Sequence, residues 1–188
     1  MPSRRFPDQI ETARLILRPP TAADVPGIVA AVNASFTELN EWMAWANGPY
    51  GADNAQAFCD ASLEALAAER EYSTVLVHRG DDRIIGGMGL LDAKWDVPRF
   101  EIGYWVHTHY VGQGYCSEAV RGLTRFAFEQ LGARRVEITM DDRNRRSWAV
   151  AERTGFELEA VHRCDRRDNQ GRLSDTRVYA MLDVSQLR

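Results

Sequence analysis

The sequence contains few cysteines and almost no lysine. Its 188 residues include three cysteines, Cys59, Cys116 and Cys164, and this odd, widely spaced set favours free thiols in a reducing compartment over a disulfide framework. No cysteine lies close to His107 and His109, so the spacing typical of a metal finger is missing and we expect no metal site. The basic side chains are nearly all arginine, which the base composition of a genome explains.

Long hydrophobic runs and a strong positive charge are also missing. No apolar stretch approaches the roughly 20 residues that cross a bilayer, and Met1 to Gln9 lack the apolar segment of a secretory signal. The formal net charge of −4 argues against direct binding to nucleic acid or to an anionic membrane. We therefore expect a cytoplasmic protein with a flexible tail at residues 1–9 and a single domain at residues 10–188.

Hydrophobic periodicity and turn residues predict an α+β chain on a mixed sheet. The expected order is strand, two helices, three strands, helix, strand, helix and two strands. The predicted strands are 15–18, 72–78, 84–91, 100–106, 135–140, one starting at Phe156 and one ending near Leu182. The predicted helices are 21–33, 53–70, one from the loop before residue 117 to about Leu131, and 144–154.

A glycine-rich loop separates the strand at 100–106 from the following helix. Gly112 and Gly114 let the backbone turn tightly and approach a ligand without interference from a Cβ atom. The first amides of a helix have no partner within it and lie at the positive end of its dipole, so residues 112–117 suit phosphate groups. The loop lacks the Gly-Lys-Ser/Thr of a nucleoside-triphosphate loop, and serine at residue 117 breaks the dinucleotide fingerprint G-x-G-x-x-G. A simple tight turn is the alternative.

Several motifs occur together in a specific order and spacing. They are Glu101-Ile-Gly-Tyr-Trp-Val106, Ser117-Glu-Ala119 after the glycine loop, Asn144-Arg-Arg-Ser147 with Gly155-Phe156 behind it, Thr12-Ala-Arg-Leu-Ile-Leu-Arg18, Trp42-Met-Ala-Trp45, and Gly171-Arg-Leu-Ser-Asp175 with Val178-Tyr179. In these motifs the chain resembles the GNAT acetyltransferase superfamily, specifically its ribosomal-protein (Rim-like) branch, over nearly its whole length.

The resemblance implies a GNAT fold, with a mixed, mostly antiparallel sheet of about seven strands that splays in the middle and about four flanking helices. It implies acetyl-CoA as co-substrate, with the pantetheine arm in the gap beside Tyr104, Trp105 and Val106. Asn144 and Ser147 would contact the cofactor from the next helix. The expected contacts of the diphosphate loop are Val111, Gly112, Gln113, Gly114, Tyr115, Cys116 and Ser117.

Two loop positions depart from the family pattern. Val111 stands where the family usually has arginine or glutamine, and Cys116 stands where it has glycine or alanine. Both changes spare the backbone contacts, so we still expect cofactor binding. We reject an acyl-cysteine on Cys116, because this residue replaces a small one beside the phosphates and direct attack in a ternary complex needs no covalent intermediate.

Acetyl transfer needs a neutral amine and an acid for the departing thiolate. A lysine amine with a pKa near 10.4 is almost fully protonated at pH 7, whereas an α-amine near 7.8 is roughly a tenth neutral. Many relatives have a tyrosine acid at the position of Ala151, so Ser147 is the candidate acid here, with a helix-surface hydroxyl as the alternative. For the base, Glu101 matches the family's glutamate, Asp165 is a second option, and a water chain is a third.

The acceptor amine is the least specified feature. Trp42 and Trp45 match the segment that lines the acceptor cleft of the Rim-like branch, although core packing explains them equally well, and Asp165 lies toward the acceptor side. The resemblance favours the N-terminal α-amine of a ribosomal or other bacterial protein. A small amine such as an amino acid, polyamine or antibiotic, and a non-catalytic acyl-CoA sensor, are the alternatives. Relatives occur as monomers and dimers, so a homodimer stays open.

Overall fold

The computed structural model describes residues 6–188. The first five residues of the predicted N-terminal tail therefore lie outside the described residues. Phe6, which the sequence assigned to that tail, is buried and its ring stacks on Tyr72 with centroids 5.2 Å apart. The hydrophobic core thus includes a residue from the segment expected to be flexible.

An eight-stranded sheet runs through the described chain in the order β1-β2-β3-β4-β5-β6-β8-β7. Its strands are β1 (Ile10–Glu11), β2 (Leu15–Arg18), β3 (Tyr72–His78), β4 (Ile84–Lys94), β5 (Arg99–Val106), β6 (Arg135–Asp141), β7 (Glu157–Arg167) and β8 (Leu173–Met181). All neighbours pair antiparallel except β5 and β6, which are parallel. The predicted mixed, mostly antiparallel sheet is confirmed, with the two-residue β1 as the strand that sequence analysis missed.

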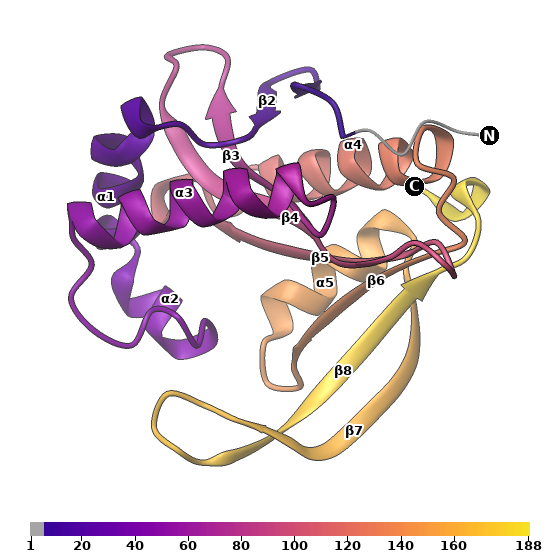
Figure 1. Ribbon diagram of the computed structural model, residues 1–188. Coiled ribbons are helices and arrows are strands. Elements are labelled where there is room, and N and C mark those ends of the chain that lie inside the picture. Colours follow the sequence, from indigo (N-terminus) through magenta and orange to yellow (C-terminus); the bar gives the residue numbers. More distant parts are fainter. Residues whose placement is uncertain (1–5) are drawn as a thin grey trace.

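Helices cover both faces of this sheet. Within residues 6–188 the α-helices are α1 (Val25–Ala34), α2 (Phe36–Trp42), α3 (Ala52–Ala67), α4 (Tyr115–Glu129) and α5 (Arg145–Thr154). Figure 1 shows α1 and α3 on one face, while α4 packs on the other face and contacts α5. Four of these helices are close to those predicted, and α2 is the addition.

Local sequence signals explain where these helices begin and end. The capping box predicted at Thr21 forms, since the Asp24 carboxylate accepts a hydrogen bond from the Thr21 amide at 2.7 Å, and α1 follows it. α5 ends at Gly155, whose φ of +98° favours glycine. A Cβ atom at Gly155 would also lie 2.0 Å from the carbonyl oxygen of Gln186, so no other residue fits there.

The two parallel strands separate soon after they meet. β5 pairs with β6 only from Arg99 to Glu101, opposite Arg135 to Glu137. Beyond this point β5 pairs with β4 alone, while β6 continues its pairing with β8. The predicted splay in the middle of the sheet is therefore confirmed.

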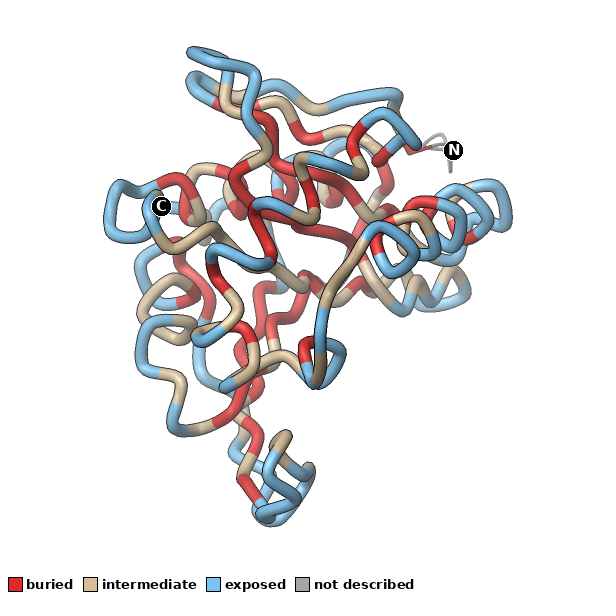
Figure 2. Tube along the Cα trace, turned by 90° about the vertical axis from the view of Figure 1, so that its left-hand side faces the viewer, coloured by how far each residue is buried: buried red, intermediate tan, exposed pale blue. Residues whose placement is uncertain are grey.

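Buried residues concentrate in the strands and on the inner helix faces, as Figure 2 shows. The larger core cluster lies between the sheet and α4, and the smaller one lies beneath α1 and α3. The β7–β8 hairpin extends away from both clusters at the bottom of Figures 1 and 2, and most of β7 is exposed. These layers leave the parted end of β5 free to border a cleft.

Candidate active site

A cleft of about 620 Å³ lies beside the parted end of β5. Its walls come from α2, the end of β5, the loop after it, the first turn of α4, and one side of α5. All but one of the residues expected to contact the cofactor line this cleft. They are Tyr104, Trp105, Val106, Val111, Gly112, Gly114, Tyr115, Cys116, Ser117, Asn144 and Ser147. A volume of this size is in the range typical of small-molecule sites.

Gln113 is the expected cofactor contact that does not line the cleft. Its side-chain amide donates a hydrogen bond to the main-chain oxygen of His109 at 2.8 Å. Its own carbonyl oxygen accepts a hydrogen bond from Arg14 at 3.0 Å. Gln113 therefore contributes to the shape of the loop.

The loop leads into α4 through two left-handed glycines. Gly112 has a φ of +81°, and Gly114, which precedes the first turn of α4, has a φ of +83°. No side chain caps this end of the helix. The first amides of α4 therefore lie at the positive end of the helix dipole without a capping group, which is the arrangement that binds phosphates at helix N-termini.

A distant segment of the chain holds this loop in place. The Glu118 carboxylate accepts hydrogen bonds from the Thr12 hydroxyl at 2.6 Å and from the Arg14 side chain at 2.6 Å. Burial alone would raise the pKa of Glu118, but these hydrogen bonds hold it below its usual value. The Arg14 guanidinium also lies 4.2 Å from the centre of the Tyr115 ring. The start of α4 is thereby fixed to the segment before β2.

Arg153 is a cleft residue that sequence analysis missed. It lies on α5 and donates a hydrogen bond to the Ser117 hydroxyl at 3.2 Å. Its charge therefore adds to the positive potential at the start of α4. The sequence gives no local signal for this contact, because the two residues are 36 positions apart.

The candidate acid Ser147 is paired with Tyr104 at the cleft. The Tyr104 hydroxyl lies 3.0 Å from both the Ser147 hydroxyl and the Ser147 main-chain oxygen. Burial raises the pKa of Tyr104 far above its usual value, so its hydroxyl stays protonated at neutral pH. Asn144 caps α5 by accepting a hydrogen bond from the Ser147 amide at 3.1 Å. Ala151 is fully buried, so no acid group lies at that position.

The candidate base Glu101 lies at the point where β5 and β6 part. Its carboxylate accepts a hydrogen bond from the Thr139 hydroxyl of β6 at 2.6 Å. Among the described residues it forms no ion pair, and it does not line the cleft. It alternates along β5 with Phe100 and Ile102, which are buried toward α4, so it belongs to the opposite face of the sheet.

The expected acceptor residues occupy different parts of the molecule. Trp42, at the end of α2, lines the cleft. Trp45 is 45% exposed and packs edge-on against Trp105, with ring centroids 6.2 Å apart. Asp165 is exposed on β7, where its one ion-pair contact is His162 at 4.0 Å, and it does not line the cleft.

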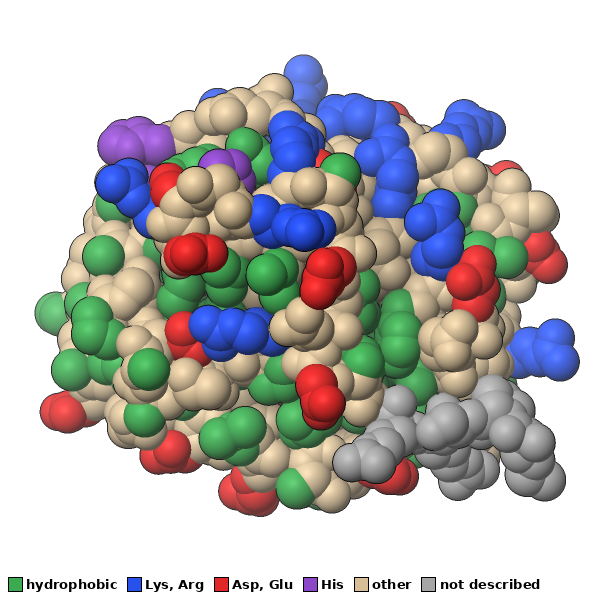
Figure 3. Space-filling view, turned by 90° about the horizontal axis from the view of Figure 1, so that it is seen from above, with side chains coloured by type: hydrophobic (Ala, Val, Ile, Leu, Met, Phe, Trp, Pro, Cys, Tyr) green, Lys and Arg blue, Asp and Glu red, His purple; other side chains and the backbone are tan. Residues whose placement is uncertain are grey.

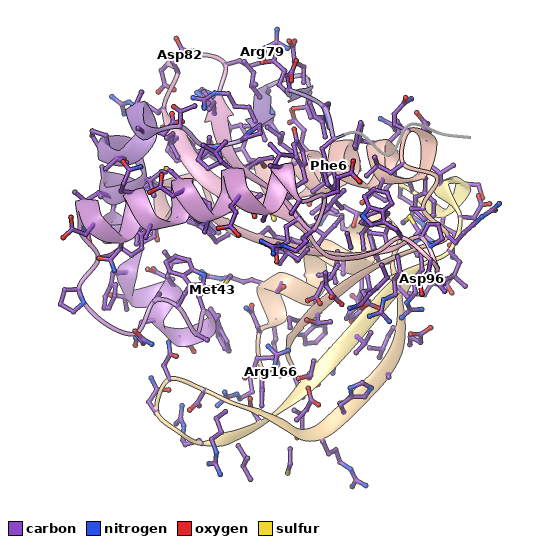
Figure 4. The ribbon with its side chains drawn as sticks, in the orientation of Figure 1. Phe6, Met43, Arg79, Asp82, Asp96 and Arg166 are labelled. Carbon is purple, nitrogen blue, oxygen red and sulfur yellow. The ribbon has the colours of Figure 1, made fainter. Side chains whose placement is uncertain are left out.

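The α2 wall supplies further cleft residues. Glu38, Leu39 and Met43 line the cleft together with Trp42. Figure 4 shows Met43 on the α2 side of the molecule and Arg166 on the β7–β8 side. Ser35 anchors this wall, because its hydroxyl accepts a hydrogen bond from the Thr108 amide at 3.0 Å.

Membrane-spanning helices and clusters of metal ligands are both absent from residues 6–188. Within residues 6–188, no helix is both long and apolar enough to cross a bilayer. In the same part of the chain, no three histidine, cysteine or acidic side chains gather as metal ligands would.

Comparison with known families gives a match at residues 14–157 to the acetyltransferase (GNAT) domain. The chain belongs to the GNAT acetyltransferase family. The matched region contains β5, the glycine loop, α4, β6 and α5, which are the elements around the cleft. The chain is accordingly an acetyl-CoA-dependent N-acetyltransferase of this family.

Two curated GNAT relatives come from Bacillus subtilis (strain 168). One, named "Probable N-acetyltransferase YjcK", is 32% identical over 64% of this chain and 66% of its own length. The other, named "Putative ribosomal N-acetyltransferase YdaF", is 31% identical over 77% of this chain and 78% of its own length.

Solved GNAT structures resemble the whole fold. A "putative ribosomal-protein-serine acetyltransferase from Vibrio cholerae" is 25% identical, covers 93% of this chain and 97% of its own, and has a TM-score of 0.79. RimL, described as an alpha-N-protein acetyltransferase of ribosomal L7/L12 in complex with coenzyme A, is 20% identical. That structure covers 94% of this chain and 99% of its own with a TM-score of 0.87, and supports the fold.

Proposed function

We propose that this GNAT enzyme acetylates the N-terminal α-amine of a protein, with a ribosomal protein as the preferred acceptor. The support comes from relatives whose names refer to ribosomal acetylation, among them the Bacillus subtilis and Vibrio cholerae proteins. An α-amine also demands less of the enzyme than a lysine, because roughly a tenth of it is already neutral at pH 7.

The observation that carries the proposal is the cleft where β5 parts from β6, with α4 beginning at its edge. The residues present fit coenzyme A. The uncapped amides after Gly114 suit its diphosphate, and the unpaired side of β5 beyond Glu101 offers backbone groups to its pantetheine amides. Bound acetyl-CoA supplies the thioester carbonyl that the amine attacks.

Ser147 and Tyr104 are proposed to handle the proton that the departing thiolate needs. The Ser147 hydroxyl lies at the cleft wall and donates its proton to the thiolate, and solvent then restores that proton. The Tyr104 hydroxyl, 3.0 Å from the Ser147 hydroxyl, keeps its own proton and stabilises the serine oxygen by a hydrogen bond. Both groups are protonated at neutral pH, so the pair needs no prior change of charge.

Glu101 is proposed to accept the amine proton, directly or through water. Its hydrogen bond from Thr139 holds the carboxylate at the end of the paired segment, on the sheet face opposite α4. Trp42 and Trp105 line the cleft, and Trp45 packs edge-on against Trp105, so aromatic rings border the cleft here. An extended peptide N-terminus fits such a border better than a bulky folded surface.

Substitution of the proton-handling pair tests the mechanism. We expect Ser147→Ala to lower kcat on the order of 100-fold and Tyr104→Phe to lower it less, because the serine hydroxyl remains a donor in the second variant. Stopped-time assays of thiol release at saturating acetyl-CoA measure this. Ser185→Ala, at an exposed serine far from the cleft, is the matched control. Wild-type kcat in Ser147→Ala would remove the serine from the mechanism.

The acceptor class is tested by mass spectrometry. Peptides beginning with alanine or serine, the same peptides with a blocked N-terminus, free lysine, a polyamine and an aminoglycoside are each incubated with the enzyme and acetyl-CoA. We expect acetylation of the free peptide N-termini only. Acetylation of the small amines alone would assign the enzyme to small-molecule acceptors. Tight acetyl-CoA binding without any acetylated product would indicate a sensor.

A further inference from the structure

A second hollow adjoins the cleft on the outer side of α4. It has a volume of about 580 Å³ and shares Gly114, Ser117 and Arg153 with the cleft. Its other wall is the chain segment at residues 11–14, between β1 and β2. A ligand whose centre sits at the start of α4 could therefore extend from one hollow into the other.

Arginine dominates the charge of this second hollow, which we call the arginine pocket. Arg14, Arg121, Arg125 and Arg153 line it, against the two carboxylates of Glu11 and Glu118. Figure 3 shows basic side chains gathered in the upper half of the view from above.

The two acids of the arginine pocket are already paired. Glu118 accepts hydrogen bonds from Thr12 and Arg14, and Glu11 lies 3.5 Å from Arg79. Arg121 and Arg125 belong to successive turns of α4, so their side chains project to the same side. The nearest carboxylate to Arg125 is Glu129 at 3.9 Å, on an exposed surface where such a contact is weak.

A glycine on α4 brings the second wall close. Gly122 lies between the two arginine turns, and a Cβ atom there would lie 2.9 Å from the Thr12 side chain. A larger residue at this position would require the Thr12 side chain or the segment that carries it to shift. The close approach narrows the arginine pocket at this point, and the Arg121 side chain in its wall also donates a hydrogen bond to the main-chain oxygen of Arg188.

The chemistry of coenzyme A identifies the ligand. Beyond its diphosphate, the molecule continues into an adenosine that carries a 3′-phosphate monoester. Guanidinium groups bind phosphate oxygens through charge-assisted, often bidentate hydrogen bonds. If the diphosphate lies at residues 112–117, as proposed above, the 3′-phosphate lies one ribose away, within reach of the arginine pocket that shares Gly114 and Ser117 with the cleft.

We propose that the arginine pocket binds the 3′-phosphate of coenzyme A, and that Arg121 and Arg125 make this enzyme select coenzyme A over 3′-dephospho-coenzyme A. This inference rests on the proposed function, because it takes coenzyme A as the ligand of the adjoining cleft. Arg153, shared by both hollows, links the diphosphate end to the 3′-phosphate end.

Calorimetric titration with the two cofactor forms tests the proposal without any acceptor. At fixed ionic strength, we expect the wild-type protein to bind coenzyme A on the order of 10-fold to 100-fold more tightly than 3′-dephospho-coenzyme A. In the Arg121→Ala/Arg125→Ala double variant this ratio should fall to about 1, mainly through weaker binding of coenzyme A. Arg121→Lys/Arg125→Lys should keep part of the preference, because it retains charge without the planar fork.

Controls separate this inference from the proposed function. Arg83→Ala removes an exposed arginine outside the pocket and should keep the wild-type ratio, and circular dichroism verifies that every variant is folded. Equal wild-type affinity for the two forms overturns the pocket assignment while leaving the proposed function standing. A wild-type ratio that survives in the double alanine variant overturns the roles of the two arginines. Failure of coenzyme A to bind at all contradicts the proposed function itself.

Discussion

Cys116 lies in the wall of the cofactor cleft, where a reactive thiol would change the mechanism. Burial raises the pKa of this thiol to about 12, although the nearby charge of Arg153 acts in the opposite direction. Such a thiol is protonated at neutral pH and is a poor nucleophile. The geometry therefore agrees with direct transfer from the thioester to the amine, in which no residue carries the acetyl group.

We expect Cys116→Ala to retain most of the wild-type rate of acetyl transfer, because a small residue keeps the loop intact. In the native enzyme, an alkylating reagent should modify the exposed Cys164 first and leave Cys116 and the buried Cys59 protected. Peptide mass spectrometry after timed alkylation measures this order. An inactive Cys116→Ala that still binds coenzyme A would point to a covalent role for the thiol.

The cofactor side of the site was easier to predict from the sequence than the acceptor side. Residues 112–117 form one continuous loop at the start of a helix, so local rules on glycine and helix N-termini locate them. Arg153 and Glu38 reach the same cleft from helices far along the chain. Only the packing of the sheet brings them there, and no local pattern encodes that contact.

At the scale of elements, the first predicted helix ended at residue 33, and the sequence analysis assigned no helix to the residues that form α2. Ser35 separates α1 from α2, because its φ of −116° and ψ of 10° depart from helical values. Its side-chain hydroxyl accepts a hydrogen bond from the Thr108 amide. With seven residues, α2 is too short to be stable alone. The position of α2 depends on distant contacts, so the α2 wall could not be predicted from local periodicity.

One of those contacts joins α2 to the β7–β8 turn. The Asn169 side-chain amide donates hydrogen bonds to the main-chain oxygens of Asn40 at 2.8 Å and Met43 at 2.9 Å. The turn itself is held by Asp168, which accepts hydrogen bonds from Arg143 and Arg172. The hairpin thus connects the α2 wall of the cleft to the β6–α5 loop.

We expect Asn169→Ala to destabilise the protein by about 1–3 kcal/mol and to raise the KM of a peptide acceptor, because α2 loses two hydrogen bonds at its end. The dissociation constant of coenzyme A should stay unchanged, since α4 and α5 keep their contacts. Thermal unfolding, steady-state kinetics and calorimetry measure the three quantities.

Gln170→Ala is the control, because in the same turn its side chain bonds only Arg172 among the described residues, at 3.1 Å. An acceptor KM in Asn169→Ala that equals the wild-type value would show that the turn does not position α2.

At the scale of the whole molecule, a fall in pH should destabilise the end of β6 and the loop that leads to α5. The Asp141 carboxylate is buried and accepts hydrogen bonds from the Arg143 side chain at 2.8 and 2.7 Å. Chiefly through these bonds, the pKa of Asp141 is lowered to about 2. Because the folded-state pKa lies below the unfolded value of about 4, the stabilisation is complete above pH 4 and is lost as the pH falls toward 2.

We expect the free energy of unfolding to fall by up to about 2 kcal/mol from Asp141 alone across this interval. Asp141→Asn should be less stable than the wild type at pH 7, and the difference should shrink as the pH falls, since the variant has no charge to lose. Urea unfolding between pH 3 and 7 measures both curves. A constant difference across that range would rule out the charge of Asp141 as the cause.

The general architecture was predictable because it follows from patterns of period two and from turn residues, as in β5 and the β3–β4 hairpin. The parting of β5 and β6 was expected only through family resemblance, because nothing in either strand alone marks the residue at which pairing stops. Longer-range packing sets that point.

The placement of coenzyme A tests the central claim most directly. A crystal structure of the protein with coenzyme A should show diphosphate oxygens hydrogen-bonded to the main-chain amides of residues 114–117, with the pantetheine arm between the parted ends of β5 and β6. Diphosphate bound at any other part of the protein, or β5 and β6 paired along their full lengths, would contradict the assignment of this cleft as the active site.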